Sequence, residues 1–136
     1  MNTHTREILR AASAVNVEVD KLDETQERDF WDSIKRKFAL KLDGQIWCQI
    51  SFEHNKFDPQ GWKLAGEFFS DWPVILFCDA YLNVPVFRFK SKKDLDSVLG
   101  ESFHFVFYLA SEDLSKLVSY DDHECLRAHG FGNLEK

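Results

Sequence analysis

The sequence predicts an α+β fold, in which an antiparallel sheet of about five to six strands carries three to four helices, mostly packed on one face. Apolar side chains recur at helical spacing early in the chain, whereas short β-rich runs dominate the later part. Connections of hairpin length join these runs and favour antiparallel pairing. A chain of 136 residues has the length of one ordinary domain. We therefore expect one domain over residues 1–136, with a helical part at 5–40 and a sheet-rich part at 45–130.

Two helices are expected in the N-terminal part. Residues 5–15 place apolar side chains at helical spacing, which predicts a first amphipathic helix. A second helix is predicted to start after Asp23, because Gln26 follows three residues later and completes a capping box. The apolar stripe of this second helix consists of Phe30, Trp31, Ile34 and Phe38.

The middle of the chain mixes strand and helix signals. Residues 45–52 alternate apolar and polar side chains, which predicts a half-buried strand. Asp58-Pro59 is typical of a helix start, and Trp72-Pro73 ends this third helix. The β-rich runs 74–79 and 84–89 then predict a hairpin.

The C-terminal part is expected to complete the sheet. Ser91 is predicted to cap a short helix that ends near Leu99. A strand follows at 103–109, where alternate residues are phenylalanine. Residues 114–120 and 123–129 predict a second hairpin around Asp121-Asp122, because aspartate tolerates turn geometry.

Charge indicates the class of partner. The formal net charge of −6 disfavours nucleic acid and suits a basic protein. Seven acids against two bases lie in residues 18–32, and five against one lie in 112–124. An exposed aromatic side chain beside such acids would form a recognition surface. The predicted partner-binding residues are Asp23, Glu24, Glu27, Trp31, Tyr120, Asp121, Asp122 and Glu124.

We find no sequence motif that strongly indicates catalysis. The sequence contains no phosphate-binding glycine loop and no serine elbow, so we predict no catalytic residue and no cofactor. One alternative uses the segment from Asp121 to His129. Its His123, Glu124 and His129 carry the ligand types that zinc prefers, which would make the protein a small metal-dependent hydrolase.

Cysteine usage and hydropathy predict the compartment. Cys48, Cys78 and Cys125 are odd in number and widely spaced, and we interpret them as reduced core residues of a cytoplasmic protein. The longest apolar runs, such as 74–78, are too short to cross a bilayer, so no membrane partner is expected.

The C-terminal half, from Trp72-Pro73-Val74 to Gly130, resembles that of small bacterial toxin-immunity-like α+β proteins. The resemblance lies in an aromatic-rich strand followed by a hairpin, with the sequence Ser119-Tyr120-Asp121-Asp122-His123-Glu124-Cys125-Leu126. It implies one-to-one binding of a toxin domain and assigns no catalytic residue. We therefore predict an immunity- or antitoxin-type inhibitor that binds a basic partner. The hydrolase is one alternative, and a homodimer formed through the edge of the aromatic sheet is another.

Overall fold

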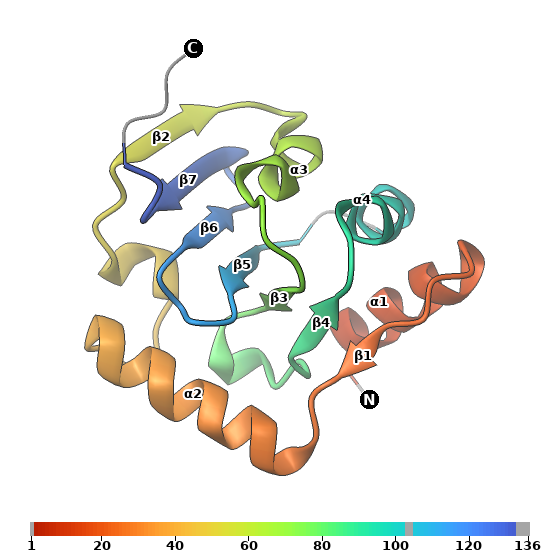
Figure 1. Cartoon of the computed structure of the whole chain (residues 1–136), viewed down its shortest axis with the longest axis horizontal. Helices are drawn as coiled ribbons and strands as arrows, with labels where there is room; N and C mark the ends of the chain where they lie inside the picture. The colour runs from red at the N-terminus through yellow and green to blue at the C-terminus, as the bar shows by residue number, and fades with distance from the viewer. Residues whose placement is uncertain (1, 103–104, 133–136) are drawn as a thin grey trace.

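The computed structural model describes residues 2–102 and 105–132, arranged as a central sheet between helices (Figure 1). Within this range the α-helices are α1 (Thr3–Ala14), α2 (Glu24–Phe38), α3 (Gly61–Leu64) and α4 (Lys92–Glu101). Short 3-10 turns occupy Ile46–Gln49, Ala65–Phe68 and Ala80–Leu82. The strands are β1 (Asp20–Lys21), β2 (His54–Phe57), β3 (Val74–Phe77), β4 (Phe87–Phe89), β5 (Phe107–Ser111), β6 (Leu117–Tyr120) and β7 (Cys125–His129).

All strand pairs are antiparallel, and the order across the sheet is β1-β4-β3-β5-β6-β7-β2. This confirms the predicted α+β class. The sheet has seven strands in the described part of the chain, slightly more than predicted, because short edge strands β1 and β2 extend it. Both predicted hairpins form, as β3 with β4 and β6 with β7. In the portion that the structure describes, no helix is both long and apolar enough to span a membrane.

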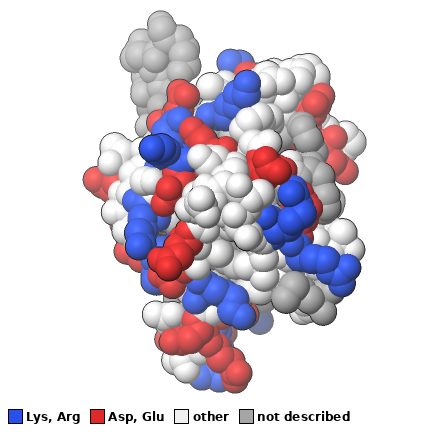
Figure 2. Space-filling model, turned by 90° about the vertical axis from the view of Figure 1, so that its right-hand side faces the viewer, with Lys and Arg blue, Asp and Glu red and all other residues white. Residues whose placement is uncertain are grey.

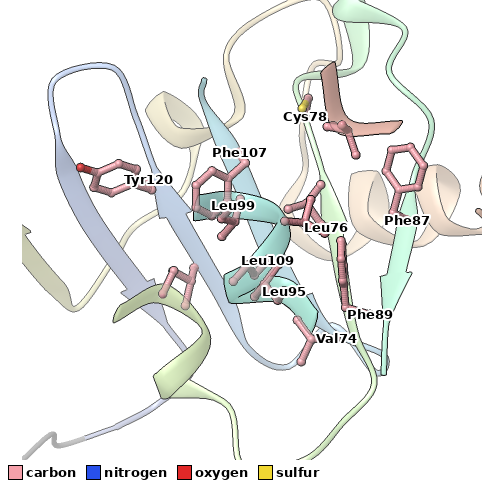
Figure 3. Close-up of a cluster of buried hydrophobic side chains, with 14 of the residues drawn as sticks. Val74, Leu76, Cys78, Phe87, Phe89, Leu95, Leu99, Phe107, Leu109 and Tyr120 are labelled. Atoms are coloured by element: carbon pink, nitrogen blue, oxygen red, sulfur yellow. The ribbon is translucent and has the colours of Figure 1, made fainter. Parts of the chain in front are cut away.

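One face of the sheet is covered by α1, α3 and α4. Acidic and basic side chains both lie on the outer surface of this helical layer (Figure 2). Its inside contacts the side chains that point to this face of the strands, such as Leu76, Phe89 and Leu109 (Figure 3). Three of the four α-helices in the described range therefore lie on one face, as expected.

The opposite face is covered by α2 and the turn at Ile46–Gln49. Phe30 and Ile34 of α2 pack with Phe77 and Tyr108 of the sheet, where the rings of Phe77 and Tyr108 stack 5.1 Å apart. The predicted capping box at the start of α2 is present, because Asp23 accepts from the Gln26 N–H and Gln26 accepts from the Asp23 N–H. Helix α2 thus begins where the sequence predicts.

The strand predicted at 45–52 is wrong. Residues Ile46–Gln49 form a 3-10 turn instead, because two of its N–H groups donate to the hydrogen-bonded pair of Asp79 and Tyr108. Asp79 Oδ1 accepts from the Ile46 N–H at 2.8 Å and from the Tyr108 hydroxyl at 2.7 Å, and that hydroxyl accepts from the Trp47 N–H. Burial, followed by the nearby Asp79 carboxylate, raises the pKa of Tyr108, which keeps the phenol protonated as a donor.

Other boundaries differ in smaller ways. Asp58 does not cap a helix directly; its carboxylate accepts from the Gln60 N–H, and α3 begins after Gln60. Helix α4 continues to Glu101, and β5 begins only at Phe107. The predicted start of that strand at 103 lies outside the described residues. Of the cysteines, Cys78 is buried in the core as predicted, whereas Cys48 is exposed, contrary to prediction.

Residues 130–132 fold back onto the start of β2. The Glu53 carboxylate accepts from the N–H groups of Gly130, Phe131 and Gly132 at 2.7, 3.1 and 3.3 Å. Partial burial raises the pKa of Glu53, but these backbone donors outweigh it, so the pKa is lowered from the ordinary 4.5. Phe131 then packs against Phe68 and extends the hydrophobic cluster between the sheet and the layer of α1, α3 and α4.

Replacing Tyr108 with Phe should destabilise the fold by roughly 1–3 kcal/mol, because Asp79 and the Trp47 N–H each lose a buried hydrogen bond. Urea denaturation would measure the free energy of unfolding. Tyr81→Phe is the matched control, because Tyr81 is 46% exposed. Equal stability of the two variants would contradict the proposed role of the Asp79–Tyr108 pair.

Replacing Glu53 with Gln should lower the melting temperature at neutral pH and have progressively less effect in acid. A carboxylate whose pKa is lowered in the folded state stabilises the fold at any pH above its ordinary pKa of 4.5. This contribution is lost as the pH falls through the pKa of the folded state. Thermal melts of both proteins from pH 7 down to about pH 3 would test this. Asp43→Asn, which removes one charge from an exposed residue, controls for net charge. A difference that is independent of pH would contradict the assignment.

Candidate functional site

The first acidic stretch lines a hollow of about 540 Å³ beside the start of α2. All four residues predicted there, Asp23, Glu24, Glu27 and Trp31, contribute to its wall. The remaining lining residues are Lys21, Leu22, Ala80, Asn83, Val84 and Pro85. The sequence does not predict that the β3–β4 connection, residues 80–85, lines this hollow. No sequence pattern places that connection beside α2.

The three acids of this hollow differ in how free they are to bind. Asp23 caps α2 through its bond from the Gln26 N–H. Glu27 is half-buried and accepts from the Val86 N–H at 2.9 Å, which fastens α2 to the residue before β4. Glu24 is exposed in the first turn of the helix. Glu24 is therefore the acid of this hollow that is best placed to meet a cation.

Trp31 provides the apolar part of the same hollow. It is half-buried and contacts Phe30 and Phe77 edge-on, with ring centroids 5.2 and 5.7 Å apart. These contacts fix the indole on the sheet while part of it remains accessible. A fixed aromatic side chain beside carboxylates is a common arrangement at the centre of protein interfaces.

The second acidic stretch lines a smaller hollow of about 260 Å³. The four residues predicted there, Tyr120, Asp121, Asp122 and Glu124, all contribute to its wall. The other lining residues are Trp62, Leu99, Ser102, Phe105 and Phe107. Trp62, Phe105 and Phe107 are not among the residues that the sequence predicts to bind a partner.

Two of the predicted residues are not exposed, which corrects the prediction. Tyr120 is 3% exposed and its hydroxyl donates to the Asp58 carbonyl. Asp121 is 2% exposed, because its carboxylate accepts from the N–H groups of His123 and Cys125 and forms an ion pair with Arg127. Asp121 therefore holds the β6–β7 turn, while the accessible charge of this hollow belongs to Asp122 and Glu124.

Both hollows lie at the same end of the sheet. The strand register aligns Phe77 with Tyr108 and Phe107 with Tyr120, so β3 ends where β5 begins and β6 ends. Figure 3 labels Phe107 and Tyr120, which lie at this end of β5 and β6, and we call it the Tyr120 end. β4 and β6 are three strand spacings apart in the sheet order, or roughly 14 Å. The two acidic stretches, distant in sequence, thus lie at the same end of the sheet, one against each face.

The alternative metal site at His123, Glu124 and His129 is not supported. His123 lies in the turn and His129 at the far end of β7, so an extended strand separates them. His129 instead lies 3.5 Å from Glu53 and packs against Phe38. Among residues 2–102 and 105–132, no three His, Cys, Asp or Glu side chains converge as metal ligands would.

Comparisons of the chain with protein-family models, curated proteins and solved structures gave no match.

Gly61 allows α3 to pack closely against Tyr120, which lines the second hollow. A Cβ at this position would lie 2.5 Å from the Tyr120 ring, which is itself buried and cannot move aside easily. We expect Gly61→Ala to destabilise the fold by roughly 1–3 kcal/mol in urea denaturation. Gly44→Ala is the matched control, because its nearest contact would be an ordinary 3.4 Å. Equal stability of the two variants would show that Tyr120 does not fix this wall.

Proposed function

We propose that this chain is a cytoplasmic protein-binding protein that holds a basic partner protein against the Tyr120 end of its sheet. The observation that supports this most strongly is the position of the two acidic stretches. Each lines a hollow with aromatic side chains, and both hollows lie at that end. A partner with basic side chains would be attracted to both.

The charge distribution favours local recognition over a uniform field. On the side of the molecule that carries α1 and α4, acidic and basic side chains are interspersed (Figure 2). At the hollows, by contrast, Glu24, Asp122 and Glu124 outnumber the one lining lysine, Lys21. Charges of one sign beside an apolar wall attract a cation more strongly than the same charges spread in water, because the local dielectric constant is lower.

The size of the surface also suits a protein partner. A standard interface buries about 800 Å² on each side, which is wide enough to extend across the end of the sheet from one hollow to the other. Trp31 would supply a fixed aromatic contact at one hollow, and the accessible carboxylates would supply charge at both. Such an interface combines a desolvated centre with steering charges at its rim.

The immunity-type function is the form of this proposal that the resemblance of the C-terminal half supports. An inhibitor of that kind binds a toxin domain one-to-one and needs no catalytic group of its own. The acidic Tyr120 end would cover a basic surface of the toxin, such as one that engages a nucleic-acid backbone. The partner is thus expected to be a basic protein, and its binding should weaken with salt.

A charge-matched pair of variants tests the proposal. Asp23→Asn with Glu24→Gln removes two charges from the first hollow and keeps a good N-cap residue. Asp29→Asn with Asp32→Asn removes two charges from exposed residues of α2 that do not line the hollow. We expect affinity capture from a lysate of the native host, followed by mass spectrometry, to recover one basic protein with the wild type and the control, and much less with the hollow variant.

The same experiment can fail in two informative ways. Equal recovery by both variants would contradict binding at the first hollow. Recovery of only a second copy of the chain would instead support the homodimer, for which Phe57, 66% exposed on the edge strand β2, offers a contact.

A further inference from the structure

The second hollow has aromatic walls that are held in place. Four aromatic side chains line it, namely Trp62, Phe105, Phe107 and Tyr120. Phe107 and Tyr120 are buried, and Trp62 lies so close to Gly100 of α4 that a Cβ there would be 3.3 Å from its ring. Aromatic faces carry partial negative charge and attract cations.

The rim of this hollow adds full negative charge. Asp122 and Glu124 line it, and among the described residues no lysine or arginine does. The Asp121 carboxylate is engaged with Arg127, so it does not compete for a ligand. Lys63, which does not line the hollow, places its Nζ 5.4 Å from the centroid of the Trp62 ring, so this ring already takes part in a cation–aromatic contact.

The volume indicates a single side chain as the occupant. At about 260 Å³ the hollow is smaller than the pockets that hold drug-sized ligands, which begin near 300 Å³. Aromatic walls with carboxylates at the rim suit a guanidinium better than an ammonium. The guanidinium is planar and weakly hydrated, stacks on aromatic rings and donates two hydrogen bonds to one carboxylate.

We infer that the hollow lined by Trp62, Phe105, Phe107 and Tyr120 receives an arginine side chain of the basic partner, with Asp122 and Glu124 as its counter-ions. This inference rests on the proposed function and names the partner's chemistry at one position. The inserted arginine would be an anchor residue, since arginine and aromatic side chains dominate binding energy at protein interfaces.

Nuclear magnetic resonance of the ¹⁵N-labelled chain tests this without any partner. The probe is arginine blocked at both ends, N-acetyl-arginine N-methylamide, and the neutral citrulline analogue is its isosteric control. We expect the arginine probe to shift the Trp62 indole signal and the backbone signals of residues 120–124, and the citrulline probe to do so much less. Asp122→Asn with Glu124→Gln should weaken arginine binding by about tenfold. Asp29→Asn with Asp32→Asn should leave it unchanged.

Several outcomes would overturn the inference. They are equal shifts by arginine and citrulline, shifts confined to other surfaces, or an unchanged affinity in the Asp122, Glu124 variant. The spectrum of each variant shows directly whether it folds. Equal affinity for the blocked lysine analogue would overturn the assignment to a guanidinium. Because the probe replaces the partner, failure here leaves the capture result at the first hollow standing, and the proposed function is judged separately.

Discussion

The structure depends on a sheet whose central strands are buried on both faces. Every residue of β3 and β6 is buried, and successive side chains of a strand point to opposite faces, so both faces must be covered. Helices α1, α3 and α4 cover one face, and α2 with the Ile46–Gln49 turn covers the other. The sequence between β3 and β4 and the turn between β6 and β7 then meet the helical layers at the ends of the strands. Both acidic hollows lie at one such end, one against each layer.

The acids at this end divide into structural and accessible ones. Asp23, Glu27 and Asp121 each accept a backbone N–H and hold a helix start, a strand and a turn. Burying a carboxylate is tolerated only where donors satisfy it, and Arg127 completes that requirement at Asp121. Glu24 and Asp122 are exposed and Glu124 is half-buried, so these three acids supply the accessible charge of the hollows. The division explains how one region can be acidic, stable and open to binding, because the charges that fix the hollows differ from those that face outward.

Local signals were sufficient for part of this arrangement. The capping box of Asp23 and Gln26 and the turn at Asp121-Asp122 involve neighbours in sequence, and both formed as predicted. The strand predicted at 45–52 failed because Asp79 and Tyr108, far away in sequence, bind the N–H groups of Ile46 and Trp47. Tyr120 and Asp121 were predicted to bind a partner, but Tyr120 is buried in close contact with Gly61 and Asp121 is buried in an ion pair with Arg127. Trp62 and Phe105 line the second hollow because separate elements pack together there. The spacing of residues along the sequence does not reveal such packing.

Hydrogen–deuterium exchange of the chain, alone and saturated with the captured basic partner, tests most directly whether the Tyr120 end is the contact surface. The proposed function predicts that slowing of exchange is concentrated in three segments that meet there, at residues 22–31, 80–86 and 120–125. Edge strand β2, on the far side of β7, should exchange at the same rate in both states. Protection centred on β2 or on α1, with the three segments unchanged, would contradict binding at the acidic hollows.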